Sequence, residues 1–373
     1  VLARRARELE EEAHKENARQ ASDAGSEGAG VRPARTESRP KPHEFWSSQL
    51  MHPEWLLDIP DTLSTDWFIS PRPEGARCIV VASKGVTTSR ARSGLILHQF
   101  QSRLPGGSRL DTSGAGACVL DCIYHEANAT YYVVDMMVWK GHSLYDCTTE
   151  FRLFWVATKL LEDSGTELPQ DLERQGYPFS PLTSFNCSQE ALEACRSGAV
   201  PFTRDGILFR HKDAHYTPGH SPSPLNLVWK DGSTSRYFLD TDAAGVVLEH
   251  QMVVLEYRMD QTVATSDGPP VVLGKLPQDF VTRLGAKLKV GSKLRFSIRD
   301  GGIQFCDGQA VGADLRFEGL SNPRRGRVDF ISKILFQYFA RRDPLTFEKL
   351  TLAVAPSLSP SPADSVTASG MED

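Results

Sequence analysis

The sequence contains no uninterrupted apolar run that approaches the ~20 residues a membrane-spanning helix requires. Its first residues are charged and do not resemble the apolar core of a secretory signal. We therefore expect a globular, intracellular protein with no membrane partner. Because the chain starts at Val1, the presence of a targeting segment upstream is left open.

Cysteine is scarce and never occurs in the paired C-x-x-C spacing that is typical of tetrahedral zinc sites. We expect reduced thiols that mostly fill the core, and we expect no metal site and no cofactor. The seven cysteines are Cys78, Cys118, Cys122, Cys147, Cys187, Cys195 and Cys306.

The chain also lacks an excess of positive charge. Lys and Arg total 42 and Asp and Glu total 47, which gives a formal net charge of −5 and a pI near 6.1. A nucleic acid would therefore have to bind at a local basic patch, because the field of the whole chain does not attract it. With 373 residues, of which 40% are hydrophobic, the chain can bury a substantial core, and its length favours two domains.

The remaining features divide the sequence into four segments. Residues 1–44 combine a charged, helix-forming stretch that has no apolar stripe with a linker rich in Gly, Ser and Pro. Residues 45–231 and 232–352 contain many short strand-like runs, and residues 353–373 have the composition of a disordered tail. Short turn-like loops between the runs favour antiparallel sheets over alternating βα units. We predict an α+β fold, in which an antiparallel-sheet domain precedes a small β-rich barrel of the OB-like kind.

The individual elements follow from local pattern. We expect a helix or an extended strap in QLMHPEWLLDIPDTL and a weak helix in SQEALEACRSG, while DFISKILFQYFARRD predicts a helix that closes the second domain. The strands expected in the first domain are DWFIS, ARCIVVAS, GLILHQF, CVLDCIY, YYVVDMMVW and FRLFWVAT. Those expected in the second domain are RYFLDTD, GVVLEHQMVVLEY, PPVVLGKL, KLRFSIRD, GIQFCDGQAV and LRFEGL.

Three blocks of the first domain resemble motifs of the covalent nucleotidyltransferases, the superfamily of mRNA guanylyltransferases and ligases. The blocks are RPEGAR, CVLDCIY and DGILF, followed by a W-K strand end. Members of this superfamily attack the α-phosphate with the lysine of K-x-D-G-x-R. Arg72 stands at that position here, and a guanidinium that stays protonated is not a plausible nucleophile. Residues 121–123 read Asp-Cys-Ile in place of the motif D-G-E. The resemblance therefore implies a nucleotide cleft that has lost the reaction.

Longer blocks resemble the snurportin family, adaptors that recognise the trimethylguanosine cap of spliceosomal U snRNAs and carry the particles to importin-β. The resemblance covers about residues 49–230, and its blocks are WLLDIPDTLSTDW, LPGGSR, VLDCIYHEANATYYVVDMMVWKGHSLYDC and DGILFRHKDAHYTPG. In addition, LARRARELEEE resembles the end of the importin-β-binding helix of that family. The resemblance implies a monomeric protein that is not an enzyme and shuttles between nucleus and cytoplasm, with an export receptor as a further partner.

The resemblance also implies which aromatic residues hold the cap. A base made cationic by methylation has an electron-poor face, and stacking on an indole contributes about 1–3 kcal/mol per base. Trp229 is the expected stacking platform, and Trp55 is expected to form an apolar wall at the methylated edge. A longer loop after YTPG leaves Val228 as the alternative aligned position. Pro53 replaces a family serine near the cap.

The cap polyphosphate requires cations, and forked guanidinium groups suit phosphate oxygens. Arg77, Arg92 and Lys230 are the expected phosphate contacts.

Two other functions stay open at this point, which are an active guanylyltransferase and a scaffold with an empty cleft. It is equally open whether the second domain binds RNA or only braces the first, because its basic cluster of Arg324, Arg325 and Arg327 is also typical of a solvated loop.

Overall fold

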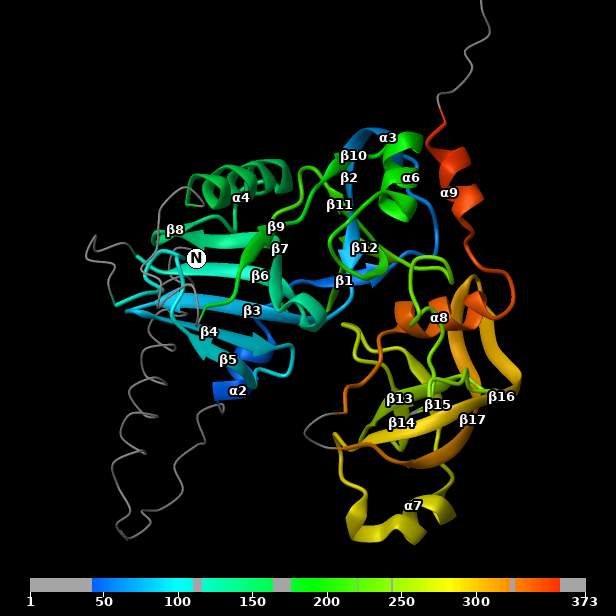
Figure 1. Cartoon of the computed structure of the whole chain (residues 1–373). Helices are drawn as coiled ribbons and strands as arrows, with labels where there is room; N and C mark the ends of the chain where they lie inside the picture. The colour runs from blue at the N-terminus through cyan, green and yellow to red at the C-terminus, as the bar shows by residue number, and fades with distance from the viewer. Residues whose placement is uncertain are drawn as a thin grey trace, which may run out of the picture.

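A computed structural model of the chain describes residues 42–109, 116–163, 176–219, 221–242, 244–322 and 326–355. The charged segment before Pro42 and the tail after Ala355, both expected from composition, lie outside the described residues. The described part contains two sheets in the N-terminal domain and a third in the C-terminal domain (Figure 1). The predicted α+β class with largely antiparallel sheets is confirmed.

The first sheet of the N-terminal domain carries one wall of the site described below. Its strands, in spatial order, are β1 (His52–Trp55), β12 (Pro222–Trp229), β11 (Arg204–His211), β2 (Trp67–Pro73) and β10 (Phe185–Asn186). The pairing of β1 with β12 is parallel and the other pairs are antiparallel. Its outer face packs against α3 (Leu63–Asp66) and α6 (Gln189–Ser197), and α6 confirms the helix expected in SQEALEACRSG.

The second sheet is covered on both faces. Its strands, in spatial order, are β5 (Ile96–Phe100), β4 (Val86–Ala91), β3 (Ala76–Ser83), β6 (Cys118–His125), β7 (Thr130–Trp139) and β8 (His142–Ser143), with β9 (Phe179–Pro181) paired to β7. The side chains of β3 alternate between a core under α4 (Thr149–Asp163) and a core that contains Trp46 of α2 (Pro42–Ser47). Burial on both faces explains the nearly continuous apolar runs of these strands.

The segment FRLFWVAT was expected to be a strand, and that prediction is wrong. It forms part of α4, the helix that covers the second sheet in Figure 1. The buried positions are Thr149, Arg152, Val156 and Leu160, which follow the spacing of one helical face. Because Arg152 is charged, a count of apolar residues alone does not detect this helical period.

The C-terminal domain is a nearly closed five-stranded barrel. Its strands, in spatial order, are β15 (Val272–Lys275), β14 (Thr262–Ala264), β13 (Met252–Tyr257), β16 (Lys293–Cys306) and β17 (Gln309–Leu320). Closure brings β15 against β17, where an added Cβ at Gly274 would lie 3.1 Å from Leu315. The short helices α7 (Gln278–Leu284) and η2 (Gly285–Lys287) follow the third strand in the sequence, as in an OB fold. The predicted OB-like barrel is confirmed.

Several element predictions for this domain need correction. RYFLDTD and GVVLEH form no strand of the described sheets and contribute only the isolated bridge between Thr241 and Val247. The short strand β14 was not expected, and the runs from residue 293 onward merge into two long strands. In the first domain, β4 was likewise not expected. Each merged strand bends at register shifts, which explains why a turn was expected in the middle.

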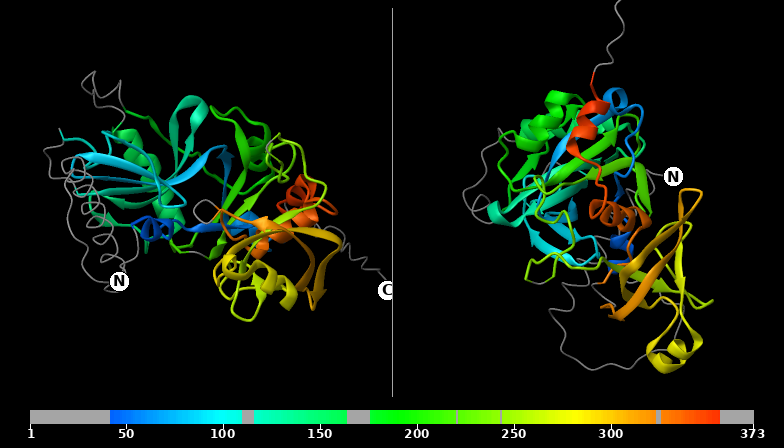
Figure 2. Two further views of the ribbon diagram at one scale, coloured as in Figure 1. Left: turned by 90° about the horizontal axis from the view of Figure 1, so that it is seen from below. Right: turned by 90° about the vertical axis from the view of Figure 1, so that its right-hand side faces the viewer.

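The end of the described chain returns to the first domain. The helix α8 (Ile331–Ala340), expected from DFISKILFQYFARRD, lies between the barrel and β1, and α9 (Phe347–Ala353) follows it. Phe347 and Leu350 of α9 join the core under the first sheet, beside α6 (Figure 1). Figure 2 shows the barrel at one end of the N-terminal domain from two further directions.

Candidate functional site

A cleft with a volume of about 1480 Å³ lies between the N-terminal domain and the barrel. Strands β1, β2, β3, β11 and β12 line it on one side, and β13, β16 and α8 line it on the other. The resemblance to nucleotidyltransferases predicted a nucleotide cleft and left open whether the second domain contributes to it. In the structure the barrel contributes about as much of the lining as the first domain does.

One wall of the cleft is apolar because of strand register. Trp55 on β1 is the neighbour of Val228 on β12, and Val228 is the neighbour of Leu208 on β11. Side chains of directly paired residues lie on the same face of a sheet, so all three line the cleft. Trp55 is partly buried, with its ring centroid 4.5 Å from that of Phe336 on α8. The structure therefore brings Trp55 to the cleft, as the sequence predicted.

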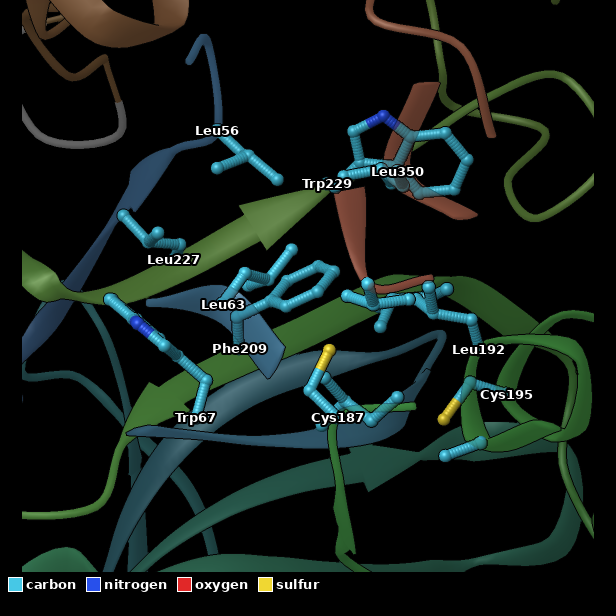
Figure 3. Packing of buried hydrophobic residues seen from close by; sticks show 14 of the residues in the cluster. Leu56, Leu63, Trp67, Cys187, Leu192, Cys195, Phe209, Leu227, Trp229 and Leu350 are labelled. Carbon is cyan, nitrogen blue, oxygen red and sulfur yellow. The ribbon is translucent and has the colours of Figure 1, made fainter. Parts of the chain in front are cut away.

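Trp229 does not lie in the cleft, which corrects the expectation that it is the stacking platform. Its side chain is 0% exposed and belongs to the core on the outer face of the first sheet, as Figure 3 shows. Its indole Nε1 donates a hydrogen bond to the Leu345 carbonyl oxygen at 2.8 Å. Neighbouring side chains of a strand alternate between faces, so Val228, the alternative position, points to the cleft and Trp229 points away.

Lys230 and Arg72 share one carboxylate at the cleft. The Lys230 Nζ and the Arg72 guanidinium both form ion pairs with Asp205, which also accepts a hydrogen bond from Ser235. Burial, followed by the charge of Arg72, lowers the pKa of Lys230 to about 7. Burial, followed by the charge of Arg77, lowers the pKa of Arg72 to about 10, so that this guanidinium stays protonated at neutral pH. The motif position of the nucleophilic lysine is thus held by a charged, paired arginine.

Arg77 is anchored on the floor of the cleft. Its Nε and Nη2 donate to the two carboxylate oxygens of Asp121 at 3.0 and 2.6 Å, and Nη2 also donates to the Met51 carbonyl oxygen at 2.7 Å. Burial opposes the charge of Arg77, but Asp121 outweighs it and raises the pKa of the guanidinium. Tyr216 donates to the same carboxylate at 2.8 Å. Arg77 is therefore held in one orientation, with its charge largely compensated.

Arg92 lacks such compensation. Its Nη2 donates to His52 Nδ1 at 3.1 Å, since arginine has no acceptor atom, and its Nε is buried without a partner among the described residues. Burial, followed by the charge of Arg327 on the barrel side, lowers the pKa of Arg92 to about 9. The two guanidinium groups therefore face each other across the cleft without a carboxylate partner in the described part of the chain. A bound anion would relieve their repulsion.

The cleft is electropositive although the chain is acidic. Eight lysine or arginine side chains and three carboxylates line it, whereas the whole chain has a formal net charge of −5. This is the local patch that composition required for binding a nucleic acid. Sequence reasoning missed the barrel contributions Lys293, Arg295 and Lys333, and left open whether Arg327 binds RNA or belongs to a solvated loop. Only closure of the barrel onto the first domain assembles these residues.

Metal binding has little support in the described residues. They contain no cluster of three or more His, Cys, Asp or Glu side chains that could hold a metal ion. All seven cysteines are free thiols, and five of them are buried, which confirms the expectation for most of them. None of the described helices is both long and apolar enough to cross a membrane.

Two antiparallel sheets beside a cleft, with an OB-like barrel on the opposite side, define a nucleotidyltransferase-like domain followed by an OB-like domain. Residues 49–229 match the family model described as Snurportin1, m3G cap-binding domain. This part of the chain therefore matches a snurportin m3G cap-binding domain, as its resemblance to that family predicted.

Among solved structures, the chain is similar to DNA ligases. One is described as mycobacterial DNA ligase D complexed with ATP and MES, with 11% identity and a TM-score of 0.33, over 76% of this chain and 99% of that one. Another is the ligase domain of M. tuberculosis LigD, with 12% identity and a TM-score of 0.34, over 75% of this chain and 98% of that one. Likeness at this level carries no conclusion about activity, and the fold class follows from the strand topology and the family match.

Proposed function

We propose that this chain binds the trimethylguanosine cap of U snRNA without transferring a nucleotide, and that it links the capped particle to importin-β. The observation that carries the proposal is the arrangement of Trp55. Of the six tryptophans, all of which are described, Trp55 is the one that lines the cleft, and the Lys230 Nζ lies 5.7 Å from its ring centroid. An aromatic wall beside several cations suits a methylated base that carries a polyphosphate.

In this arrangement each group has a separate task. Trp55 contacts the methylated base, and the neighbouring Val228, Leu208 and Pro53 exclude water from its methyl groups. Arg77, Arg92 and Lys230 compensate the phosphate charge, and the buried amide of Asn226 on the same strand is available to the base edge. Trp229 supports this wall from the core behind the sheet.

Replacement of Trp55 tests the proposal. We expect Trp55→Ala to lower affinity for a trimethylated cap dinucleotide by about 1–3 kcal/mol, which is roughly 5-fold to 150-fold, because one stacking contact is lost. Titration calorimetry with trimethylated, monomethylated and unmethylated dinucleotides measures the loss and the methyl preference. The control is Trp155→Ala on α4, since Trp155 does not line the cleft. Equal affinity of wild type and Trp55→Ala at equal stability would refute the assignment.

The import function rests on residues 1–44, most of which lie outside the described part. Their stretch LARRARELEEE supports an interaction with importin-β by similarity alone. The proposal implies a monomeric adaptor that shuttles between cytoplasm and nucleus and returns with an export receptor. Binding of purified importin-β to the full chain, and loss of binding when residues 1–44 are deleted, would support it.

One observation favours the alternative of a guanylyltransferase-like enzyme. Lys230 has a lowered pKa and lies in the cleft beside Arg72, so a lysine amine is present near the position of the lost nucleophile. Its ion pair with Asp205 opposes this role, because it favours the charged, non-nucleophilic amine. Incubation with labelled GTP and magnesium, followed by mass spectrometry, is expected to give no covalent adduct. A guanylate on Lys230 would favour the enzyme instead.

A further inference from the structure

The barrel side of the cleft carries positive charge of its own. Arg295 lies on β16 and Arg327 lies between β17 and α8, and both line the cleft. Both side chains are exposed, and neither has a hydrogen bond or an ion pair with a carboxylate in the described part of the chain. They come from the domain that the family match over residues 49–229 does not include.

The acidic side chains of the cleft cannot compensate this charge, because they are already paired. Asp329 and Asp240 lie 3.0 and 3.5 Å from the Lys333 Nζ. Glu256 lies 3.8 Å from an Arg258 guanidinium nitrogen. Arg295 and Arg327 therefore remain available to an external anion.

The charges of the two domains face each other across the same space. Arg327 of the barrel is the neighbour whose charge acts most strongly on Arg92 of the first domain, and Arg92 has no carboxylate partner among the described residues. Like charges that act on each other in this way oppose the apposition of the two domains unless an anion lies between them. An anion with several charges, bound from both sides, would stabilise it.

A capped RNA supplies such an anion. Trp55 places the base at the wall of the first domain, and the polyphosphate and the following nucleotides continue into the remaining cleft, whose other wall is the barrel. We infer that the C-terminal barrel is the second half of the RNA site, in which Arg295 and Arg327 bind phosphates of the RNA that follows the cap base. This inference rests on the proposed cap binding and extends it from the cap nucleotide to the RNA chain.

The test compares ligands of increasing phosphate content. Wild type, Arg295→Ala and Arg327→Ala are titrated with trimethylguanosine nucleoside, with the capped dinucleotide and with a capped oligonucleotide, each at several salt concentrations. We expect each substitution to weaken binding of the capped oligonucleotide by about tenfold and to reduce the salt slope by about one, as for one lost phosphate contact. Binding of the nucleoside should not change.

A matched control is Arg316→Ala on β17, since Arg316 is 64% exposed on the same barrel but does not line the cleft. Unchanged affinity and salt slope for the capped oligonucleotide in both cleft variants would overturn the inference, while cap binding itself would stand. Wild type could instead bind capped and uncapped oligonucleotides with equal affinity. If both affinities then fell in Arg295→Ala and Arg327→Ala, the proposed cap recognition would fail and the barrel site would stand.

Discussion

Val228 and Trp229 are consecutive residues of β12 with opposite environments. Val228 faces the cleft beside Trp55. Trp229 is buried on the outer face of the sheet, beneath α9. A shift of one residue in an alignment exchanges the two faces, because the side-chain period of a strand is two. The longer loop before β12 left this register undetermined, and the core around Trp229 resolves it. Trp55, Arg77, Arg92 and Lys230, in contrast, line the cleft as predicted, and their roles in cap binding stay predictions.

We expect Lys230 to make cap affinity dependent on pH. Because its pKa is lowered to about 7 by burial and then by Arg72, the amine loses its charge as the pH rises through neutrality. The carboxylates of Asp205 and Asp240 and the amine of Lys333 also act on it. We expect affinity for the capped dinucleotide to fall between about pH 6 and pH 8, because a neutral amine no longer attracts phosphate.

The control for this effect is Lys230→Arg, which keeps a positive charge over the whole range. Calorimetric titrations of both proteins at several pH values separate the contribution of Lys230, since any titration of the cap base is common to both. Parallel pH profiles would show that Lys230 does not titrate in this range or does not contact the phosphates.

At the scale of single elements, α4 is where local pattern failed. A short run rich in aromatic and β-branched residues reads as a strand when only its apolar residues are counted. In the structure the buried face of this helix includes Arg152, whose guanidinium donates to both carboxylate oxygens of Asp135 on β7 at 2.8 and 2.9 Å. The helix is therefore oriented by a buried ion pair whose partner lies on another element, 17 residues earlier in the chain.

Removal of this ion pair is expected to be costly. Arg152→Ala leaves the Asp135 carboxylate buried without its partner, and we expect the free energy of unfolding to fall by about 3–5 kcal/mol. Denaturant unfolding followed by circular dichroism measures the change. Lys159→Ala on the same helix removes a partly exposed pair with Glu162 and a contact with the Trp155 ring, and should cost about 1 kcal/mol or less. Similar losses in the two variants would contradict the role assigned to Arg152.

At the scale of the whole molecule, the last described helix ties the two domains together. The barrel follows the first domain in the sequence, but α9 returns to the first domain and packs against Trp229 and α6. The Gln189 side chain on α6 also donates to the Thr351 carbonyl oxygen of α9 at 3.2 Å. The first domain is therefore built from two separate segments of the chain, one before the barrel and one after it. We expect the first domain to depend on α9 for its stability.

Leu350 and Leu352 of α9 test this dependence. Leu350 is 0% exposed in the core of the first domain, and Leu350→Ala should lower the free energy of unfolding by about 2–5 kcal/mol, because it leaves a cavity. Leu352 is 73% exposed, and Leu352→Ala should change it by less than about 0.5 kcal/mol. Tryptophan fluorescence during denaturant unfolding reports on this core through Trp229. Equal stability of the two variants would show that α9 does not support the first domain.

The class of fold, most strands of the first domain and the presence of a following barrel were readable from the sequence. Apolar runs, turn residues and the order of the motif blocks are local properties, and they suffice where each element buries one continuous stripe. The loss of the nucleophilic lysine at Arg72 is equally local. Three other features depend on partners in other segments of the chain. These are the helical state of α4, the face occupied by Trp229 and the return of α9 to the first domain. The basic cleft also depends on tertiary structure. Arg92 and Arg327 are 235 positions apart in the numbering (327 − 92), and they come together only when the barrel packs against the first domain.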